Sequence, residues 1–202
     1  MEQPKKILVV RGGAIGDFIL TLPVFQALRK KFPNAIIGCL SPPAPGGLAR
    51  MSGWADETRS LDDGCWASFF VENGELDPNA SAWLASFDCI ISYLHDELGG
   101  WRKNVMRVNE ATFLRGRSQL EKRGDQNASV TLLEALKPLG ITNTDPVPRI
   151  RITDPPIKTN TIALHPGSGS VSKNWPEQEW SQLISMLLED GQSLLLVGGE
   201  AE

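Results

Sequence analysis

The chain of 202 residues has few of the side chains that build metal centres and disulfide frameworks. It contains three cysteines and two histidines. Cys39, Cys65 and Cys89 are widely spaced and form no CxxC pair. This spacing indicates neither a zinc site nor a set of disulfides. Reduced thiols are typical of cytoplasmic proteins, and we expect that location here.

Long hydrophobic runs are also absent. No stretch approaches the roughly 20 apolar residues that a membrane-spanning helix needs. The N-terminus passes from MEQPKK into a short apolar segment, which is too short for the core of a signal peptide. We therefore expect membrane contact to be at most peripheral.

The sequence also lacks an excess of positive charge. Twenty Lys and Arg residues oppose 24 Asp and Glu residues, which gives a net charge of −4. This balance argues against nucleic acid as a partner. Arg29, Lys30 and Lys31 form one short basic cluster at the end of an expected helix. We interpret them as cations that complement the negative end of the helix dipole.

The first forty residues predict a strand, a helix and a second strand. Residues 7–10 are a continuous aliphatic run, as in a strand buried on both faces of a parallel sheet. Apolar residues at helical spacing follow over residues 17–31, where Pro23 either kinks the helix or begins a second helical segment. Residues 35–40 are the next strand. This order predicts a right-handed βαβ unit.

The rest of the chain continues the α/β pattern, with a proline-rich boundary near residues 145–156. Residues 101–113 show no clear period. The other expected elements are a loop over 42–47, helices over 48–51, 80–86, 130–137 and 176–190, and strands over 87–94, 162–165 and 193–197. We expect a Rossmann-like domain over residues 1–154 and the incomplete start of a second over 155–202.

The first turn of the chain is rich in glycine and ends in a carboxylate. Gly12, Gly13 and Gly16 allow a tight turn and the close approach of a ligand, and Asp17 follows them. The spacing is GGxxG rather than GxGxxG, so an NAD-dependent oxidoreductase is disfavoured. Asp17 either caps the following helix or serves as a catalytic carboxylate.

A second turn of small residues precedes the expected helix over 176–190. Ser168 and Gly169 lie in it, and Lys173 follows. Backbone N–H groups and hydroxyls of such a turn bind a diphosphate, to which a lysine adds a point charge. The alternative is a polar loop with a solvated lysine. His95, near Asp96 and Glu97, either joins a site or lies at a solvated loop end, and we favour the loop end.

The two turns resemble glycosyltransferase family 9, the heptosyltransferases of the lipopolysaccharide inner core. The opening of that family is similar to ILVVRGGAIGDFILTLPVFQALRKKFPNA, and the start of its second domain to IALHPGSGSVSKNWPEQEWSQLISMLLEDGQSLLLVGGEAE. The segment FDCIISY fits the family's central N-terminal strand. The likeness is loose between residues 41 and 154. The resemblance implies a GT-B architecture of two Rossmann-like lobes that face each other across a cleft.

The resemblance also implies the partners and the chemistry. The donor is a nucleotide sugar, typically ADP-heptose, and the acceptor is a lipid-linked saccharide, with inversion at the sugar. Asp17 matches the family's proposed general base. Lys173 matches the lysine that neutralises the leaving diphosphate, and Ser168 and Gly169 match residues beside the phosphates. Glu200 and Glu202 lie where one family acid meets the ribose.

No DxD triplet occurs, so no metal ion and no other cofactor is expected. Family members continue beyond the equivalent of residue 202, and we therefore expect a C-terminally truncated form. Three readings stay open: a glycosyltransferase, a non-catalytic nucleotide- or glycan-binding remnant of the same fold, and a structural interaction protein.

Overall fold

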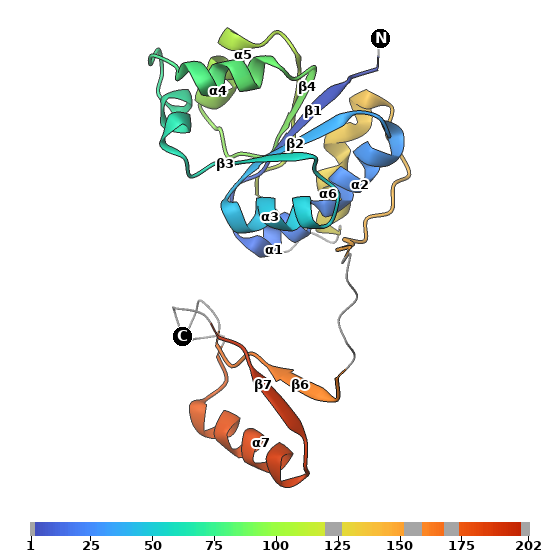
Figure 1. Ribbon diagram of the computed structural model, residues 1–202. Coiled ribbons are helices and arrows are strands. Elements are labelled where there is room, and N and C mark those ends of the chain that lie inside the picture. The colour runs from blue at the N-terminus through green and yellow to red at the C-terminus, as the bar shows by residue number, and fades with distance from the viewer. Residues whose placement is uncertain (1–2, 120–126, 152–158, 168–173, 199–202) are drawn as a thin grey trace. The chain divides into compact units, whose positions relative to one another are not determined.

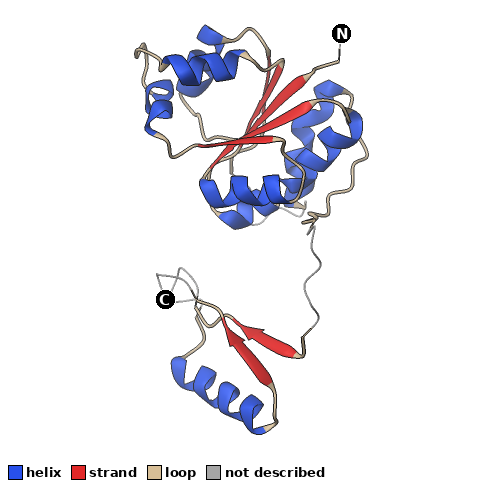
Figure 2. Ribbon diagram, viewed as in Figure 1, coloured by secondary structure: helices blue, strands red, loops and turns tan. Residues whose placement is uncertain are grey.

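The computed structural model describes residues 3–119, 127–151, 159–167 and 174–198. The chain divides into two compact units, Met1–Thr153 and Asp154–Glu202. Figures 1 and 2 show both units as sheets of parallel strands accompanied by helices. Each unit is described by itself below.

The first unit is built on a five-stranded parallel sheet in the order β3-β2-β1-β4-β5. Its strands are β1 (Lys6–Val10), β2 (Ile36–Ser41), β3 (Glu57–Ser60), β4 (Cys89–Ser92) and β5 (Thr112–Arg115). The central strand β1 pairs with β2 on one side and β4 on the other, with Val9 opposite both Cys39 and Ile91. The strand order therefore changes direction beside β1. In open α/β sheets, ligands bind outside the carboxyl ends of the strands at such a point.

Helices cover both faces of this sheet, because alternate side chains of β1 point to opposite faces. Ile7 and Val9 belong to one apolar cluster, and Leu8 and Val10 to the other. Figure 2 shows helices on both sides of the strands. The elements around the first cluster are α1 (Ile15–Ile19), α2 (Leu22–Lys31), α3 (Pro43–Met51), α6 (Ala128–Leu133) and the 3₁₀ helix η2 (Glu134–Leu139). Those around the second are the 3₁₀ helix η1 (Gly64–Phe70), α4 (Pro78–Ala85) and α5 (Gly100–Val108).

The predicted βαβ unit is confirmed, and its helix is divided in two. α1 ends at Ile19, and α2 begins at Leu22 with Pro23 in its first turn. Proline fits there because the first N–H groups of a helix have no partner within the helix. Of the two alternatives for Pro23, a kink or a second helical segment, the structure shows the second segment.

The expected loop over residues 42–47 is wrong. α3 begins at Pro43, with Pro42 as its N-cap residue. The two prolines and Pro45 all lie in the cap or first turn, where a missing N–H costs nothing. Gly46 is held close to β2, because a Cβ there would lie 3.0 Å from the Ser41 hydroxyl. Close packing against the sheet, rather than helix propensity, explains this helix.

Other elements are absent from the sequence prediction or differ from it. β3 is a short polar edge strand, and α5 and β5 occupy most of the unassigned residues 101–113. The helix over 130–137 is confirmed in part: α6 passes into η2, which contains Pro138 and ends at Gly140 with φ 68°. The strand expected over residues 87–94 is confirmed as the shorter β4.

The second unit contains β6 (Thr161–Leu164), α7 (Glu177–Glu189) and β7 (Ser193–Leu196). β6 and β7 are parallel, with Ile162 opposite Leu194. These elements confirm the three that the sequence predicts for this region. No residue of α7 is buried. Within the described residues of the chain, no helix is long and apolar enough to cross a membrane.

Gly38 offers a test of the packing between β2 and α4. A Cβ at this position would lie 2.7 Å from the ring of Phe87, which is buried and packs edge-on against Trp83. We expect Gly38→Ala to lower the free energy of unfolding by about 1–3 kcal/mol. Urea unfolding followed by circular dichroism measures it. The control is Gly47→Ala, at an exposed position of α3. A Cβ there meets nothing within 4 Å, and we expect the free energy of unfolding to rise by about 0.5–1 kcal/mol. Equal effects of the two changes would contradict this account.

Candidate functional site at the carboxyl edge of the first sheet

The loop after β1 turns at the carboxyl edge of the sheet, between β2 and β4. Gly13 has φ 94°, a conformation that side chains with a Cβ rarely adopt. A Cβ on Gly12 would lie 3.1 Å from the Leu94 side chain. Gly16 differs, because it lies within α1 and a Cβ there would meet nothing within 4 Å. The turn thus depends on Gly12 and Gly13, while Gly16 leaves open space one residue before Asp17.

Asp17 lies in the first turn of α1 with half of its side chain exposed. The N-cap residue of α1 is Ala14, which supplies no capping side chain. Within the described residues, the Asp17 carboxylate accepts no hydrogen bond, and the nearest cation is the Arg11 guanidinium at 3.9 Å (Nη2 to Oδ1). The carboxylate is therefore open to a ligand from the solvent side, which a hydrogen-bonded helix cap would not be.

Arg11 is buried behind Asp17, with 2% of its surface exposed. Its Nη1 donates to the Ser118 carbonyl oxygen at 3.0 Å and to the Tyr93 carbonyl oxygen at 3.4 Å. Burial lowers the pKa of Arg11, and the nearby Asp17 carboxylate opposes that shift. The guanidinium thus connects the loops that follow β1, β4 and β5.

Tyr93 directly follows β4, and its side chain is buried. Its hydroxyl donates to the Leu132 carbonyl oxygen at 2.8 Å, and burial raises the pKa of the phenol far above its ordinary value. The ring lies so close to Gly116 that a Cβ there would be 2.1 Å away. Tyr93 is therefore a fixed neutral donor that holds α6 and the loop after β5 against β4.

A broad polar hollow of about 630 Å³ opens at the ends of β4 and β5. Its lining includes His95, Glu97, Arg115, Arg117 and Ser118. His95 Nε2 lies 3.8 Å from the Glu97 carboxylate, and both side chains are exposed. Because Arg11 donates to the Ser118 carbonyl, this hollow adjoins the Asp17 loop.

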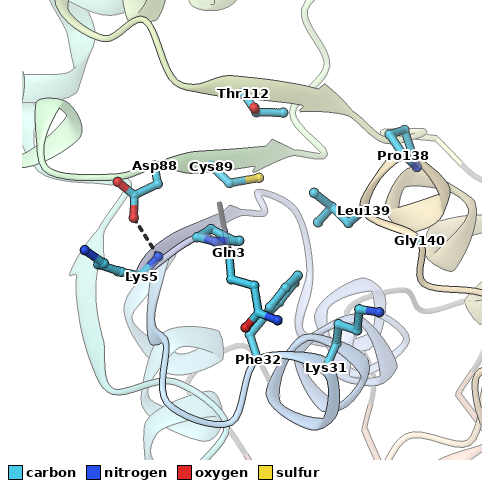
Figure 3. Close-up of a pocket in the computed structure, with 11 residues that line it drawn as sticks. Gln3, Lys5, Lys31, Phe32, Asp88, Cys89, Thr112, Pro138, Leu139 and Gly140 are labelled. Atoms are coloured by element: carbon cyan, nitrogen blue, oxygen red, sulfur yellow. Dashed lines mark hydrogen bonds between the residues drawn. The ribbon is translucent and has the colours of Figure 1, made fainter. Parts of the chain in front are cut away.

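A different hollow of about 560 Å³ lies at the opposite, amino-terminal edge of the sheet. Figure 3 shows Asp88, Cys89, Thr112 and Leu139 around it. The Asp88 carboxylate accepts from the backbone N–H groups of Lys5 and Lys6, at 2.7 and 2.8 Å. These bonds anchor the start of β1 beside β4. The Asp88 carboxylate thus has a structural role, and this hollow lies away from Asp17.

The residues predicted to bind the donor lie outside the described part of the chain. Ser168, Gly169 and Lys173 belong to residues 168–173, and Glu200 and Glu202 to residues 199–202. Their roles stay predictions.

No family model matches the chain, and no curated protein matches it. Solved structures do match. A family 9 glycosyl transferase from Veillonella parvula DSM 2008 aligns over 99% of this chain and 65% of its own, with 19% identity and a TM-score of 0.67.

Two Escherichia coli structures match similarly. Heptosyltransferase WaaC with ADP aligns over 95% of this chain and 66% of its own, with 14% identity and a TM-score of 0.64. ADP-heptose lipopolysaccharide heptosyltransferase II aligns over 96% and 65%, with 15% identity and a TM-score of 0.63. The chain has the fold of these GT-B-like glycosyltransferases. It spans about two thirds of their length.

The sequence gives little indication of the contacts that two residues make at this site. Arg11 directly follows a buried strand, yet its acceptors lie 82 and 107 residues away. His95 is exposed, as the favoured interpretation predicts, and it also lines the hollow beside Ser118, as the alternative predicts. Its position at the end of β4 was the available signal, since parallel strands bring their carboxyl ends to one edge.

The glycines of the first turn make a matched pair for a stability test. We expect Gly13→Ala to lower the free energy of unfolding by about 1–2 kcal/mol, because the alanine would adopt a positive φ. Gly16→Ala should leave it unchanged or raise it by up to about 1 kcal/mol, since this position lies in a helix and is open. Thermal and urea unfolding measure both. Equal destabilisation by the two changes would show that the turn is described wrongly.

Proposed function

We propose that this chain belongs to a nucleotide-sugar-dependent glycosyltransferase that passes heptose from ADP-heptose to a lipopolysaccharide-core acceptor with inversion. The observation that carries the proposal is the Asp17 carboxylate. It is half-exposed and accepts no hydrogen bond from the described residues at the carboxyl edge of the sheet. The fold shared with family 9 and heptosyltransferase structures supports the reaction class.

In this proposal Asp17 is the general base. Its carboxylate accepts the proton of the acceptor hydroxyl while that oxygen attacks the anomeric carbon of the donor. The new bond forms on the face opposite the leaving group, the bond from the anomeric carbon to the diphosphate oxygen breaks, and ADP leaves. Arg11 stays behind the carboxylate and holds it at the edge of the turn.

The acceptor is placed in the hollow beside Asp17. Arg115 and Ser118 line it together with His95, so it offers charged and polar groups to a saccharide. Because the acceptor is lipid-linked, the protein contacts the cytoplasmic face of the inner membrane peripherally.

The donor is assigned to the second unit. Lys173 neutralises the leaving diphosphate, Ser168 and Gly169 lie against its phosphates, and Glu200 or Glu202 meets the ribose. Since the sequence has no DxD triplet, Lys173 and the adjoining turn supply the charge stabilisation without a metal ion.

Asp17→Asn tests the base. The amide keeps the size of the side chain but cannot accept the proton, so we expect sugar transfer to fall by roughly 10²–10⁴-fold. The affinity for ADP should be unchanged. Transfer is followed by mass spectrometry of the acceptor, and ADP binding by calorimetry. Glu110→Gln, an exposed carboxylate before β5, is the control and should keep full activity. Undiminished transfer by Asp17→Asn would overturn the assignment.

Donor binding without any transfer by the unaltered chain would favour the non-catalytic remnant.

Lys173→Ala tests the donor site. Removal of a charge-assisted contact to phosphate should weaken ADP binding by about tenfold or more. Lys137→Ala removes a lysine that pairs with Glu134 in the first unit, and it should leave the affinity unchanged. Calorimetry compares the three proteins. An unaltered affinity in Lys173→Ala would remove this lysine from the donor site.

A further inference from the structure

A second hollow in the first unit carries a concentration of positive charge. It has a volume of about 610 Å³ and lies between the last turn of α2, Trp54 and residues 140–151. Five cations line it, whereas Asp145 is its only lining acid among the described residues. The five are Arg29, Lys30, Lys31, Arg149 and Arg151. The chain as a whole has a net charge of −4, so this surface is opposite in sign to the protein.

Two of these cations are neutralised within the protein. Arg29 Nη2 lies 2.6 Å from the Asp56 carboxylate, and Arg149 Nη2 lies 2.6 Å from the Asp145 carboxylate. Within the described residues, Lys30, Lys31 and Arg151 form no ion pair. The hollow therefore keeps a surplus of three positive charges.

The segment over residues 141–151 is fixed in place before any ligand arrives. Trp54 Nε1 donates to the Arg149 carbonyl oxygen at 2.7 Å, and Gln26 Nε2 donates to the Val147 carbonyl oxygen at 3.4 Å. The Arg151 guanidinium lies over the Trp54 ring, 3.8 Å from its centroid. Trp54 itself is buried. A cation held in this way loses little freedom when it binds an anion.

The dipole of α2 accounts for part of this charge. The end of a helix carries about half a negative charge, which one cation offsets. It does not account for Arg151, which comes from a distant part of the sequence. The sequence interpretation of Arg29, Lys30 and Lys31 as dipole partners is thus incomplete, since the fold adds further cations to the same hollow.

We propose that this hollow is a binding site for a ligand that carries two or more phosphate groups. Lys30, Lys31 and Arg151 supply the charge, and the hydroxyl and amide groups of Thr142, Asn143 and Thr144 line the same space. The site is separate from Asp17. α2 runs back along the sheet from the carboxyl edge, so its last turn lies near the amino ends of the strands. Figure 3 shows Lys31 beside the neighbouring hollow at that edge.

The test uses the 202-residue chain and inorganic tripolyphosphate as the probe. We expect calorimetry to detect binding that weakens as salt rises from 50 to 200 mM, because screening reduces the attraction of exposed charges. The variant Lys30→Gln/Arg151→Gln should bind at least about tenfold more weakly. The control variant Arg50→Gln/Lys103→Gln has the same net charge but changes residues outside the hollow, and it should bind within about twofold of the unaltered chain.

Two further arms separate this site from others. Tripolyphosphate can also bind at the proposed donor site, which Lys173→Ala weakens. The binding that depends on Lys30 and Arg151 should therefore persist in Lys173→Ala. Vesicles of phosphatidylcholine with and without cardiolipin, an anionic lipid with two phosphate groups, distinguish the source of the phosphate. Binding to the anionic vesicles that depends on Lys30 and Arg151 indicates a lipid headgroup; binding to tripolyphosphate alone indicates a free oligophosphate.

Either result supports a phosphate site in this hollow. Three results would overturn it: no binding to tripolyphosphate or to anionic vesicles, equal weakening in the double variant and its control, or loss of binding in Lys173→Ala alone. If the double variant does not fold, Lys31→Gln replaces it. The Lys31 side chain forms no ion pair within the described residues, and its loss should weaken binding by several-fold.

Discussion

The buried guanidinium of Arg11 is the constraint on which the carboxyl edge of the first sheet depends. A charge removed from water must have polar partners. Arg11 Nη1 donates to the carbonyl oxygens of Tyr93 and Ser118, and Nη2 lies 3.9 Å from the Asp17 carboxylate, whereas the buried Nε has no hydrogen-bond partner among the described residues. These groups follow three different strands, so one side chain connects the segments after β1, β4 and β5. Asp17 then lies at the edge of a turn in which Gly13 has a positive φ, a conformation that favours glycine.

The two edges of the same sheet have different chemistry. At the carboxyl edge, an open carboxylate lies beside a polar hollow, as general-base chemistry requires. At the amino edge, the Asp88 carboxylate is held by backbone N–H groups, and the cations at the end of α2 gather with Arg149 and Arg151 around a separate hollow. This hollow is thus a positively charged surface on a chain with a net charge of −4. We thus propose that the reaction and anion binding take place at opposite edges of one domain.

Local signals predicted much of the fold and part of the site. The aliphatic run of β1 and the helical spacing of Phe18, Leu22, Phe25 and Leu28 are patterns that periodicity detects. α3 was missed because three prolines and two glycines favour a loop until the sheet is there to pack against. β3 was missed because a polar edge strand has no apolar alternation. The turn of Gly12 and Gly13 with Asp17 was found, since glycine marks a backbone requirement that is local.

The sequence by itself determined the alternation of strands and helices, the glycine turn and the carboxylate that follows it. These depend on backbone conformation and on periods of two or 3.6 residues, which are properties of neighbours along the chain. Only the tertiary structure decided that Arg11 contacts Tyr93 and Ser118, that His95 lines the adjoining hollow, and that Arg151 joins the end of α2. The contacts of Arg11 and Arg151 join residues about 80 to 110 positions apart. Arg11 and His95 reach their surroundings because parallel strands bring their carboxyl ends to one edge, and Arg151 is placed by its packing on Trp54. Both are consequences of packing rather than of any local pattern.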